Sequence, residues 1–359
     1  MSRSTTNSKY LHFTRLHSAA RFSIGGSGVL PCKLADLGAP PGELEINSGS
    51  SAYGHKPLLE RIAAHCGVDP DCVVTSNGCS MGNHLVYAGL FEPGDEVLIE
   101  QPAYEPMLAA AEFLGAKITR FQRPFENQFA IDLRDVERRL TQRTRLIVLC
   151  NLHNPSSALT DSDVLRAIGD LARSVGARVL VDEVYLEAIV PRPRTAFSLG
   201  TEFVVTSSLT KAYGLGGLRC GWILAEPQLA RRMWGLNDLF GVHQPHPAQL
   251  LSVLAFDQMD RIAQRAQNLL TANRALLREF LKCRADLECF VPEHGTTAFP
   301  RLKRGTGDQL FELLQSKYET SIISGSFFEA PQHFRIGLGE DTEVLREGLR
   351  RLDVALGDL

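Results

Sequence analysis

The chain has 359 residues, of which 44% are hydrophobic, and its formal net charge is -3. This length suffices for one large domain or two modest ones, each with its own core. The small net charge does not favour nucleic acid or an anionic membrane as the main partner. No apolar run approaches the roughly 20 residues that a membrane span needs. Residues 1–9 are polar and lack the apolar stretch of a signal peptide, so we interpret them as a frayed tail and expect a cytoplasmic protein.

The cysteines give no indication of a metal site. Eight are scattered along the chain, and none belongs to a C-x-x-C pair. Zinc-ribbon and thioredoxin interpretations therefore lack support. Several lie in apolar segments, such as Cys150 in LIVLC, and we expect mainly buried, reduced thiols.

Short β-type runs alternate with helix-length segments between about residues 73 and 225. We expect strands at residues 73–76, 96–100, 116–121, 145–150, 178–182, 203–207 and 220–225. This alternation predicts an α/β fold, in which a mostly parallel seven-stranded sheet has helices on both faces and thus forms three layers. In such sheets ligands bind beyond the carboxyl ends of the strands.

The pattern changes after this region. Apolar residues with a period near 3.6 predict a helix over 261–280, FRIGL at 334–338 is typical of a strand, and 342–356 is expected to be the last helix. We therefore predict a large domain over 46–258. Residues 1–45 and 259–359 would form a smaller α+β domain.

The segment SSLTKAYGLGGLRCGW, residues 207–222, places Lys211 among small residues directly after a predicted strand. A lysine with few charged neighbours can lose its proton and attack a carbonyl. Ser208 and Arg219 would supply donors for a phosphate, so the segment suits a phosphate-bearing aldehyde. Taken alone, the segment is also compatible with a solvated surface lysine.

The segment ARVLVDEVYLEA, residues 177–188, places Asp182 at the end of another predicted strand. A carboxylate there can hold a pyridinium nitrogen protonated, and Tyr185 would reach the phenolic oxygen of the same ring. The alternative for Asp182 is a cap of the following helix.

Two turns follow further strands. Asn154 and Pro155 begin a turn, and the Asn154 amide could donate to the same phenolic oxygen. Gly78, Cys79 and Ser80 lie at a strand-to-helix turn whose backbone amides would bind an anion. This turn is neither G-x-G-x-x-G nor a Walker A loop, so a dinucleotide site is unsupported.

Two more side chains complete the set of candidates. Tyr104 follows a predicted strand in EQPAYEP, where it could stack on a cofactor ring or serve in packing. Arg335 lies in an apolar strand and needs an anionic partner. A substrate carboxylate bound bidentately would serve, and a structural salt bridge is the alternative.

Together these segments resemble the class I/II aminotransferases of the aspartate aminotransferase superfamily, the fold-type I enzymes that use pyridoxal 5'-phosphate (PLP). The resemblance covers nearly the whole chain after the first twenty residues. It depends on four motifs in a fixed order: N-P, D-x-x-Y, S-x-x-K and a later R-x-G.

The resemblance implies how the cofactor ring is held. Lys211 would form the internal aldimine, and Asp182 would pair with the pyridine nitrogen. Asn154 and Tyr185 would bind the phenolic oxygen, while Tyr104 would stack on the ring.

It also implies how the two anions are bound. Ser208, Arg219 and the turn at 78–80 would hold the phosphate, and Arg335 would bind the α-carboxylate of the substrate. Family members are homodimers with sites at the subunit interface. Tyr53 lies in a region from which many members send a tyrosine to the neighbour's phosphate.

The chain departs from the family pattern near the expected substrate. Its turn reads N-P-S-S at 154–157, where the family commonly has a glycine in the fourth position, and FSIGGSGVLP at 22–31 matches the family's glycine loop only loosely. The amino donor and acceptor are therefore not inferred.

We expect an aminotransferase that moves the amino group of an L-amino acid to a 2-oxo acid, with freed Lys211 as the general base. The same parts support a carbon-sulfur lyase or an amino-acid cyclase. Residues 240–247, FGVHQPHP, are expected to border the pocket.

Two functions from other classes find less support. S-x-x-K is also the nucleophile motif of penicillin-recognising acyl enzymes, but K-T-G and S-D-N are absent from the sequence. A PLP-binding regulator would need an added DNA-binding module, and the chain has neither room for one before the PLP domain nor a basic patch.

Overall fold

The computed structural model describes residues 6–17, 20–38, 44–47 and 53–359. Its centre is a seven-stranded sheet in the order β2-β8-β7-β6-β5-β3-β4. Strand β8 is antiparallel to β2 and β7, and the other pairs are parallel, which confirms the predicted mostly parallel sheet. The strands are β2 (Val73–Asn77), β3 (Glu96–Gln101), β4 (Lys117–Gln122), β5 (Thr144–Cys150), β6 (Arg178–Asp182), β7 (Phe203–Ser208) and β8 (Cys220–Leu224).

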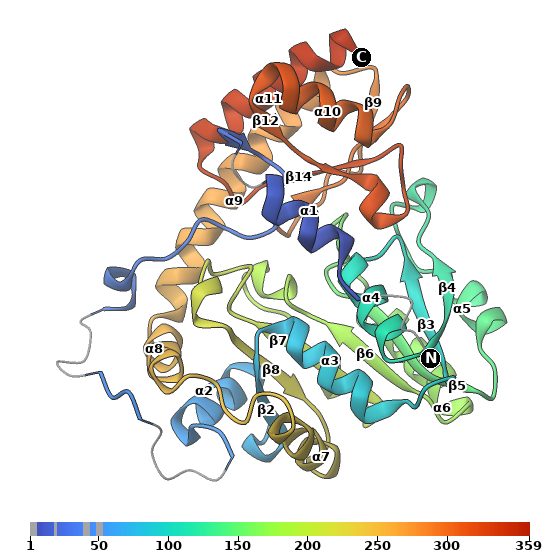
Figure 1. Cartoon of the computed structure of the whole chain (residues 1–359), viewed down its shortest axis with the longest axis vertical. Helices are drawn as coiled ribbons and strands as arrows, with labels where there is room; N and C mark the ends of the chain where they lie inside the picture. The colour runs from blue at the N-terminus through green and yellow to red at the C-terminus, as the bar shows by residue number, and fades with distance from the viewer. Residues whose placement is uncertain (1–5, 18–19, 39–43, 48–52) are drawn as a thin grey trace.

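Helices cover both faces of this sheet (Figure 1). One face packs against α3 (Cys79–Leu90), α4 (Glu105–Phe113) and α7 (Pro227–Asp238). The other packs against α2 (Lys56–Cys66), α5 (Leu133–Arg139), α6 (Ser162–Ser174) and α8 (His246–Asp257). Successive side chains of a strand point to opposite faces, so strands buried on both sides must be apolar throughout. In β5, Ile147 and Leu149 join one core, while Leu146 and Val148 join the other.

The C-terminal part combines three helices with short strands. The helices are α9 (Met259–Lys282), α10 (Gly307–Tyr318) and α11 (Thr342–Asp358). The strands are β9 (Leu287–Glu288), β10 (Thr297–Ala298), β11 (Arg301–Leu302), β12 (Thr320–Ser321), β13 (Ile323–Ser324) and β14 (Phe334–Gly337). The long helix, the last helix and the FRIGL strand thus lie where the sequence predicts them, with ends that differ by one or two residues.

The N-terminal region joins this C-terminal part. Strand β1 (Phe22–Ser23) pairs in parallel with β12, and the Gly337 amide donates to the Ile24 carbonyl at 2.7 Å. These contacts agree with a smaller unit built from both ends of the chain. The domain boundaries at residues 46 and 258 stay a prediction.

Helix α1 (Lys9–His17) was not expected from the sequence, in which residues 1–9 were interpreted as a frayed tail. Residues 1–5 lie outside the described part. Ser8 and Lys9, however, are held by the carboxylate of Glu105 at the start of α4. Figure 1 shows α1 between α4 and the C-terminal helices. The polar start of α1 therefore has a fixed partner that only the tertiary structure supplies.

Several remaining features are local. Short 3-10 helices occur at Leu34–Leu37, Pro70–Cys72, Phe125–Asn127, Leu186–Ala188, Ala196–Leu199, Gly216–Leu218 and Gly325–Phe328. All eight cysteines are free thiols, and five of them are buried, whereas Cys283 is exposed. No helix in the described ranges is both long and apolar enough to cross a membrane.

Candidate active site

A cavity of about 450 Å³ opens at the carboxyl ends of β5, β6 and β7. This is the sheet edge at which the fold predicts a ligand. Nine of the candidates named from the sequence line it: Cys79, Ser80, Tyr104, Asn154, Asp182, Tyr185, Ser208, Lys211 and Arg219. Its remaining lining residues are Leu11, Arg15, Cys150, Val184 and Thr210.

Lys211 follows β7 and points into this cavity. Removal from water disfavours the ammonium form and lowers the pKa of Lys211; Tyr10 and Asp182 oppose this shift, and Arg335 and Arg219 add to it. Its Nζ donates a hydrogen bond to Ser27 Oγ at 3.2 Å. No described carboxylate forms an ion pair with it. Lys211 is thus an amine that burial and nearby cations bias toward the neutral, nucleophilic form.

Asp182 is the last residue of β6 and is buried. Burial raises its pKa, and hydrogen bonds from Asn83 and the Val184 amide act in the opposite direction. Asn83 Nδ2 donates to Asp182 Oδ2 at 2.9 Å, and Thr206 Oγ1 donates to Asn83 Oδ1 at 2.6 Å. This chain of buried hydrogen bonds fixes the Asp182 carboxylate and shows which end of Asn83 faces it.

At the turn that begins α3, the Arg219 side chain lies close to the backbone of Gly78. Gly78 has a φ of +78°, and a Cβ at this position would lie 2.2 Å from Arg219 Nη2. The Arg219 guanidinium also donates to the Asn77 carbonyl at 3.1 Å. A larger residue at position 78 would therefore require the arginine side chain to move from the amino end of this 12-residue helix.

This corner fits a phosphate group. The amino end of α3, the Arg219 guanidinium and the Ser208 hydroxyl are donors suited to a phosphate dianion. The Thr210 hydroxyl lines the same cavity, is buried, and has no hydrogen-bond partner among the described residues. A buried hydroxyl without a partner is costly, and a bound phosphate oxygen would satisfy it. The sequence interpretation missed Thr210, although it stands within the S-x-x-K motif.

Tyr185 and Asn154 stand at the ends of neighbouring strands. Tyr185 is buried, which raises the pKa of its phenol and keeps it a hydrogen-bond donor. Asn154 is also buried, and its Oδ1 accepts a hydrogen bond from Arg335 Nη1 at 3.3 Å. Asn154 lines the cavity, and its Nδ2 group is the donor of the side-chain amide.

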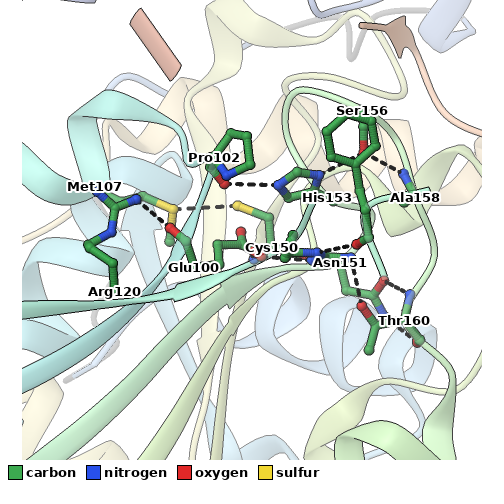
Figure 2. A network of polar contacts seen from close by, with 12 residues as sticks. Glu100, Pro102, Met107, Arg120, Cys150, Asn151, His153, Ser156, Ala158 and Thr160 are labelled. Carbon is green, nitrogen blue, oxygen red and sulfur yellow. Dashed lines mark hydrogen bonds and ion pairs between the residues drawn. The ribbon is translucent and has the colours of Figure 1, made fainter. Parts of the chain in front are cut away.

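The turn that carries Asn154 is held by a buried polar network (Figure 2). His153 Nε2 contacts the Pro102 carbonyl oxygen at 2.9 Å, and its Nδ1 contacts Ser156 Oγ at 2.7 Å. Burial lowers the pKa of His153 well below its ordinary value, so the ring is neutral. Asn151 accepts from the Thr160 amide at 3.0 Å and donates to the Thr160 carbonyl at 3.2 Å, which closes the loop at its base.

The missing family glycine of this turn has a structural explanation. Ser157 has a φ of +60°, a conformation that favours glycine. Its hydroxyl donates to the Thr297 carbonyl at 2.9 Å, and a Cβ on Gly295 would lie 2.5 Å from that hydroxyl. The chain therefore keeps the backbone of the turn with a serine, and the glycine at position 295 leaves space for the serine side chain.

Arg335 lies in β14 and is only 1% exposed. Its guanidinium donates to three neutral oxygens: the Gly25 carbonyl, Asn154 Oδ1 and Tyr10 Oη. No carboxylate in the described part of the chain forms an ion pair with it, so the salt-bridge alternative finds no partner there. A buried cation with neutral partners suits an anionic ligand. Arg335 lines a second cavity, of about 270 Å³, which shares Lys211 and Tyr104 with the first.

Among the candidates that line neither cavity are Tyr53 and the segment 240–247. Tyr53 is 52% exposed and packs near Trp234, with ring centres 5.8 Å apart. None of residues 240–247 lines either cavity. Gln244 Nε2, however, donates to the Arg219 carbonyl at 2.9 Å. Through Gln244 this segment therefore contacts the backbone of the phosphate corner, and its position beside the substrate pocket stays a prediction.

The fold and the site together define a class of enzyme. Residues 45–352 match the family model described as aminotransferase class I and II, and the chain belongs to that family. It is a PLP-dependent enzyme, and pyridoxal phosphate is its cofactor. The residues around Lys211 suit that group, because they offer an amine, a buried carboxylate for the ring nitrogen and a phosphate corner.

The similar proteins include a synthase, an aminotransferase and a cyclase. The chain is 30% identical to a capreomycidine synthase of Streptomyces vinaceus over 320 residues, which is 88% of this chain and 82% of that protein. It superimposes on a PLP-dependent aminotransferase from Streptococcus suis with a TM-score of 0.92, at 24% identity and over 99% and 98% of the two chains. It also superimposes on the PLP-dependent cyclase OrfR with a TM-score of 0.90, at 23% identity and over 100% and 99% of the chains. These two structural likenesses show the fold.

Proposed function

We propose that this protein is an aminotransferase that moves the amino group of an L-amino acid to a 2-oxo acid. The observation that carries the proposal is the position of Lys211 between two anion sites. One is the phosphate corner at Arg219, which lines a cavity with Lys211, and the other is Arg335, which lines the adjoining cavity with Lys211.

Bound PLP supplies an aldehyde for the amino group and a ring that takes up the electrons left at the α-carbon. Arg335 holds the substrate carboxylate and so orients the α-hydrogen toward Lys211. Lys211 Nζ, whose pKa burial lowers, removes that proton as a general base. The Lys211 ammonium formed in this way would then be the proton donor for the second proton transfer.

Asp182 and its neighbours serve the ring end of the cofactor. The Asp182 carboxylate holds a proton on the ring nitrogen, and Asn83 keeps the carboxylate in place. Tyr185 and Asn154 would hold the phenolic oxygen of the bound ring. These contacts favour the electron-accepting form of the ring.

Cyclisation of an amino-acid side chain is the second candidate. It is favoured by the 30% identity to a capreomycidine synthase. Proton removal at the α-carbon by Lys211 would begin this reaction as well. The residues described so far serve both reactions, so the products must distinguish them.

The test is a screen of amino acids with the pure holoenzyme, with 2-oxoglutarate or pyruvate as acceptor. We expect a 2-oxo acid to form without ammonia, beyond one equivalent per site only when an acceptor is present, and not with Lys211→Ala. A cyclic amino acid without any 2-oxo acid would contradict transamination and support the cyclase. Ammonia release would instead support a carbon-sulfur lyase or another elimination.

A further inference from the structure

Tyr10 of helix α1 stands at the carboxylate site, although no motif pointed to it. The side chain is 5% exposed and lines the 270 Å³ cavity together with Lys211 and Arg335. Arg335 Nη2 donates a hydrogen bond to Tyr10 Oη at 2.7 Å. The guanidinium carbon lies 5.5 Å from the centre of the Tyr10 ring. The phenol is thus bound to the same cation that is expected to bind the substrate.

The direction of the hydrogen bond from Arg335 to Tyr10 leaves the Tyr10 hydroxyl hydrogen free to be donated. Arginine can only donate, so Tyr10 Oη accepts from it and keeps its own hydrogen for another acceptor. No described residue accepts a hydrogen bond from the Tyr10 hydroxyl. An anion that binds Arg335 on its cavity side would therefore meet a second donor, the phenolic hydrogen.

Helix α1 is docked in a defined way. The Lys9 amide donates to Glu105 Oε1 at 3.0 Å, and Ser8 Oγ donates to Glu105 Oε2. Beside this anchor, the Tyr10 and Tyr104 rings meet edge to face, with centres 5.4 Å apart and planes at 77°. The Tyr10 ring also contacts Phe327 and Phe328, with centres 5.9 and 6.0 Å away. These contacts orient the hydroxyl before any substrate binds.

We propose that Tyr10 donates a hydrogen bond to the α-carboxylate of the substrate, so that helix α1 is part of the substrate site. The assignment rests on the proposed function in one respect only, namely that the substrate is an amino acid. It predicts that Tyr10 contributes to the binding of every amino acid, because all share the carboxylate. It also predicts that amines without a carboxylate gain nothing from Tyr10.

The experiment compares two amines that differ only in the carboxylate, 2-methylalanine and isopropylamine. Their dissociation constants are measured on the holoenzyme from the absorbance of the bound cofactor. In Tyr10→Phe we expect the constant for 2-methylalanine to rise about tenfold or more, the size of one hydrogen bond to a charged group. The constant for isopropylamine should stay unchanged. Equal changes for both amines, or no change, would overturn the assignment.

The variant is expected to fold and to bind PLP normally, because Arg335 Nη2 also donates to the Gly25 carbonyl at 2.9 Å. Thermal unfolding and PLP affinity of Tyr10→Phe check this point. Tyr318→Phe is the matched control. It removes a hydroxyl that bonds Asp358 on α11, away from both cavities, and should leave both constants as they are.

A second variant tests the role of α1 independently. Glu105→Ala removes the anchor of the helix and should weaken 2-methylalanine selectively, whereas Tyr10→Phe in that background should add less than it does alone. Fully additive effects would contradict a role of Tyr10 that depends on docked α1. If 2-methylalanine binding depends on Tyr10 but no amino acid is transaminated, the proposed function fails and the carboxylate assignment stands.

Discussion

The proposed role of Asp182 depends on its negative charge. Asp182→Asn should keep PLP bound but lower kcat by roughly a hundredfold or more, because a neutral amide does not hold the ring nitrogen protonated. Absorbance of the bound cofactor and steady-state rates measure the two effects separately. Near-normal turnover would contradict the assigned role.

Asn83 offers a matched comparison at the same site. Asn83→Ala removes one hydrogen bond to the Asp182 carboxylate but leaves the Val184 amide at 3.1 Å. We expect a smaller fall in kcat, of about tenfold, with PLP retained. A loss as large as that of Asp182→Asn would mean that Asn83 does more than hold the carboxylate.

Arg335 leads to a prediction about substrates. A buried, bidentate charge pair typically costs ~2–5 kcal/mol when one partner is truncated. Arg335→Ala should therefore lower kcat/KM by roughly 30-fold or more for every amino donor, with cofactor absorbance preserved. Arg335→Lys should rescue only part, since lysine keeps the charge but not the planar fork. A donor-selective loss would place Arg335 at the side-chain pocket instead.

The sequence predicted the residues that belong to short motifs and missed those that the fold brings in from a distance. Asp182 ends a strand, Lys211 and Asn154 follow shortly after strands, and the carboxyl ends of parallel strands meet at one sheet edge. Asn83 and Tyr10 reach the site through helix packing, across 99 and 325 residues from Asp182 and Arg335 respectively. No local pattern carries such information.

At the level of elements, the central sheet could be predicted from local sequence patterns, whereas much of the C-terminal part could not. Inner strands such as β5 and β6 are largely apolar runs, and the seven central strands could be placed to within one or two residues, including the more polar edge strand β4. The strands β9 to β13 have two residues each, too few for any period to be visible. Helix α1 was missed because its docking depends on Glu105, which is remote in sequence.

The start of α3 gives an element-scale prediction. Gly78→Ala would place a methyl group 2.2 Å from Arg219 Nη2 and also strain a backbone with a φ of +78°. We expect PLP affinity to fall at least tenfold because the arginine must move from the phosphate corner. Equilibrium titration of the apoprotein with PLP measures this change.

Gly67→Ala is a close control for backbone strain. Gly67 ends α2 with a φ of +68°, and a Cβ there would meet nothing within 4 Å. Each substitution strains a backbone with a positive φ by about 1–3 kcal/mol, with more strain at Gly78 (ψ 171°) than at Gly67 (ψ 41°), but only the one at position 78 displaces Arg219. Equal losses of PLP affinity in the two variants would refute the proposed phosphate corner.

At the scale of the whole molecule, the surface around the end of α7 exposes large apolar side chains. Leu239, Phe240 and Val242 are 74%, 55% and 53% exposed, and Tyr53 packs beside Trp234 of the same helix. Exposed apolar clusters of this kind mark interaction sites. We predict a homodimer at micromolar protein, with a mass about twice 39.5 kDa in sedimentation experiments.

Substitution of this surface should separate the subunits. Phe240→Glu combined with Val242→Glu should shift the protein toward monomers. It should also reduce PLP affinity, because in this family the active site lies at the subunit interface. Val354→Glu, at a 46% exposed position of α11, is the control and should remain dimeric. A wild-type monomer with full activity would refute the dimer.

Tyr53 provides the sharpest test of a shared site. It lines neither cavity of its own chain, so a role at the cofactor phosphate requires the neighbouring subunit. If Tyr53 reaches across, a heterodimer of Tyr53→Ala and Lys211→Ala subunits has one site with both defects and one with neither. Mixing the two weakly active or inactive variants should then restore up to about a quarter of wild-type activity, because half of the dimers are mixed and each has one intact site. If the mixture regains nothing although mixed dimers form, Tyr53 acts within its own subunit or not at the phosphate.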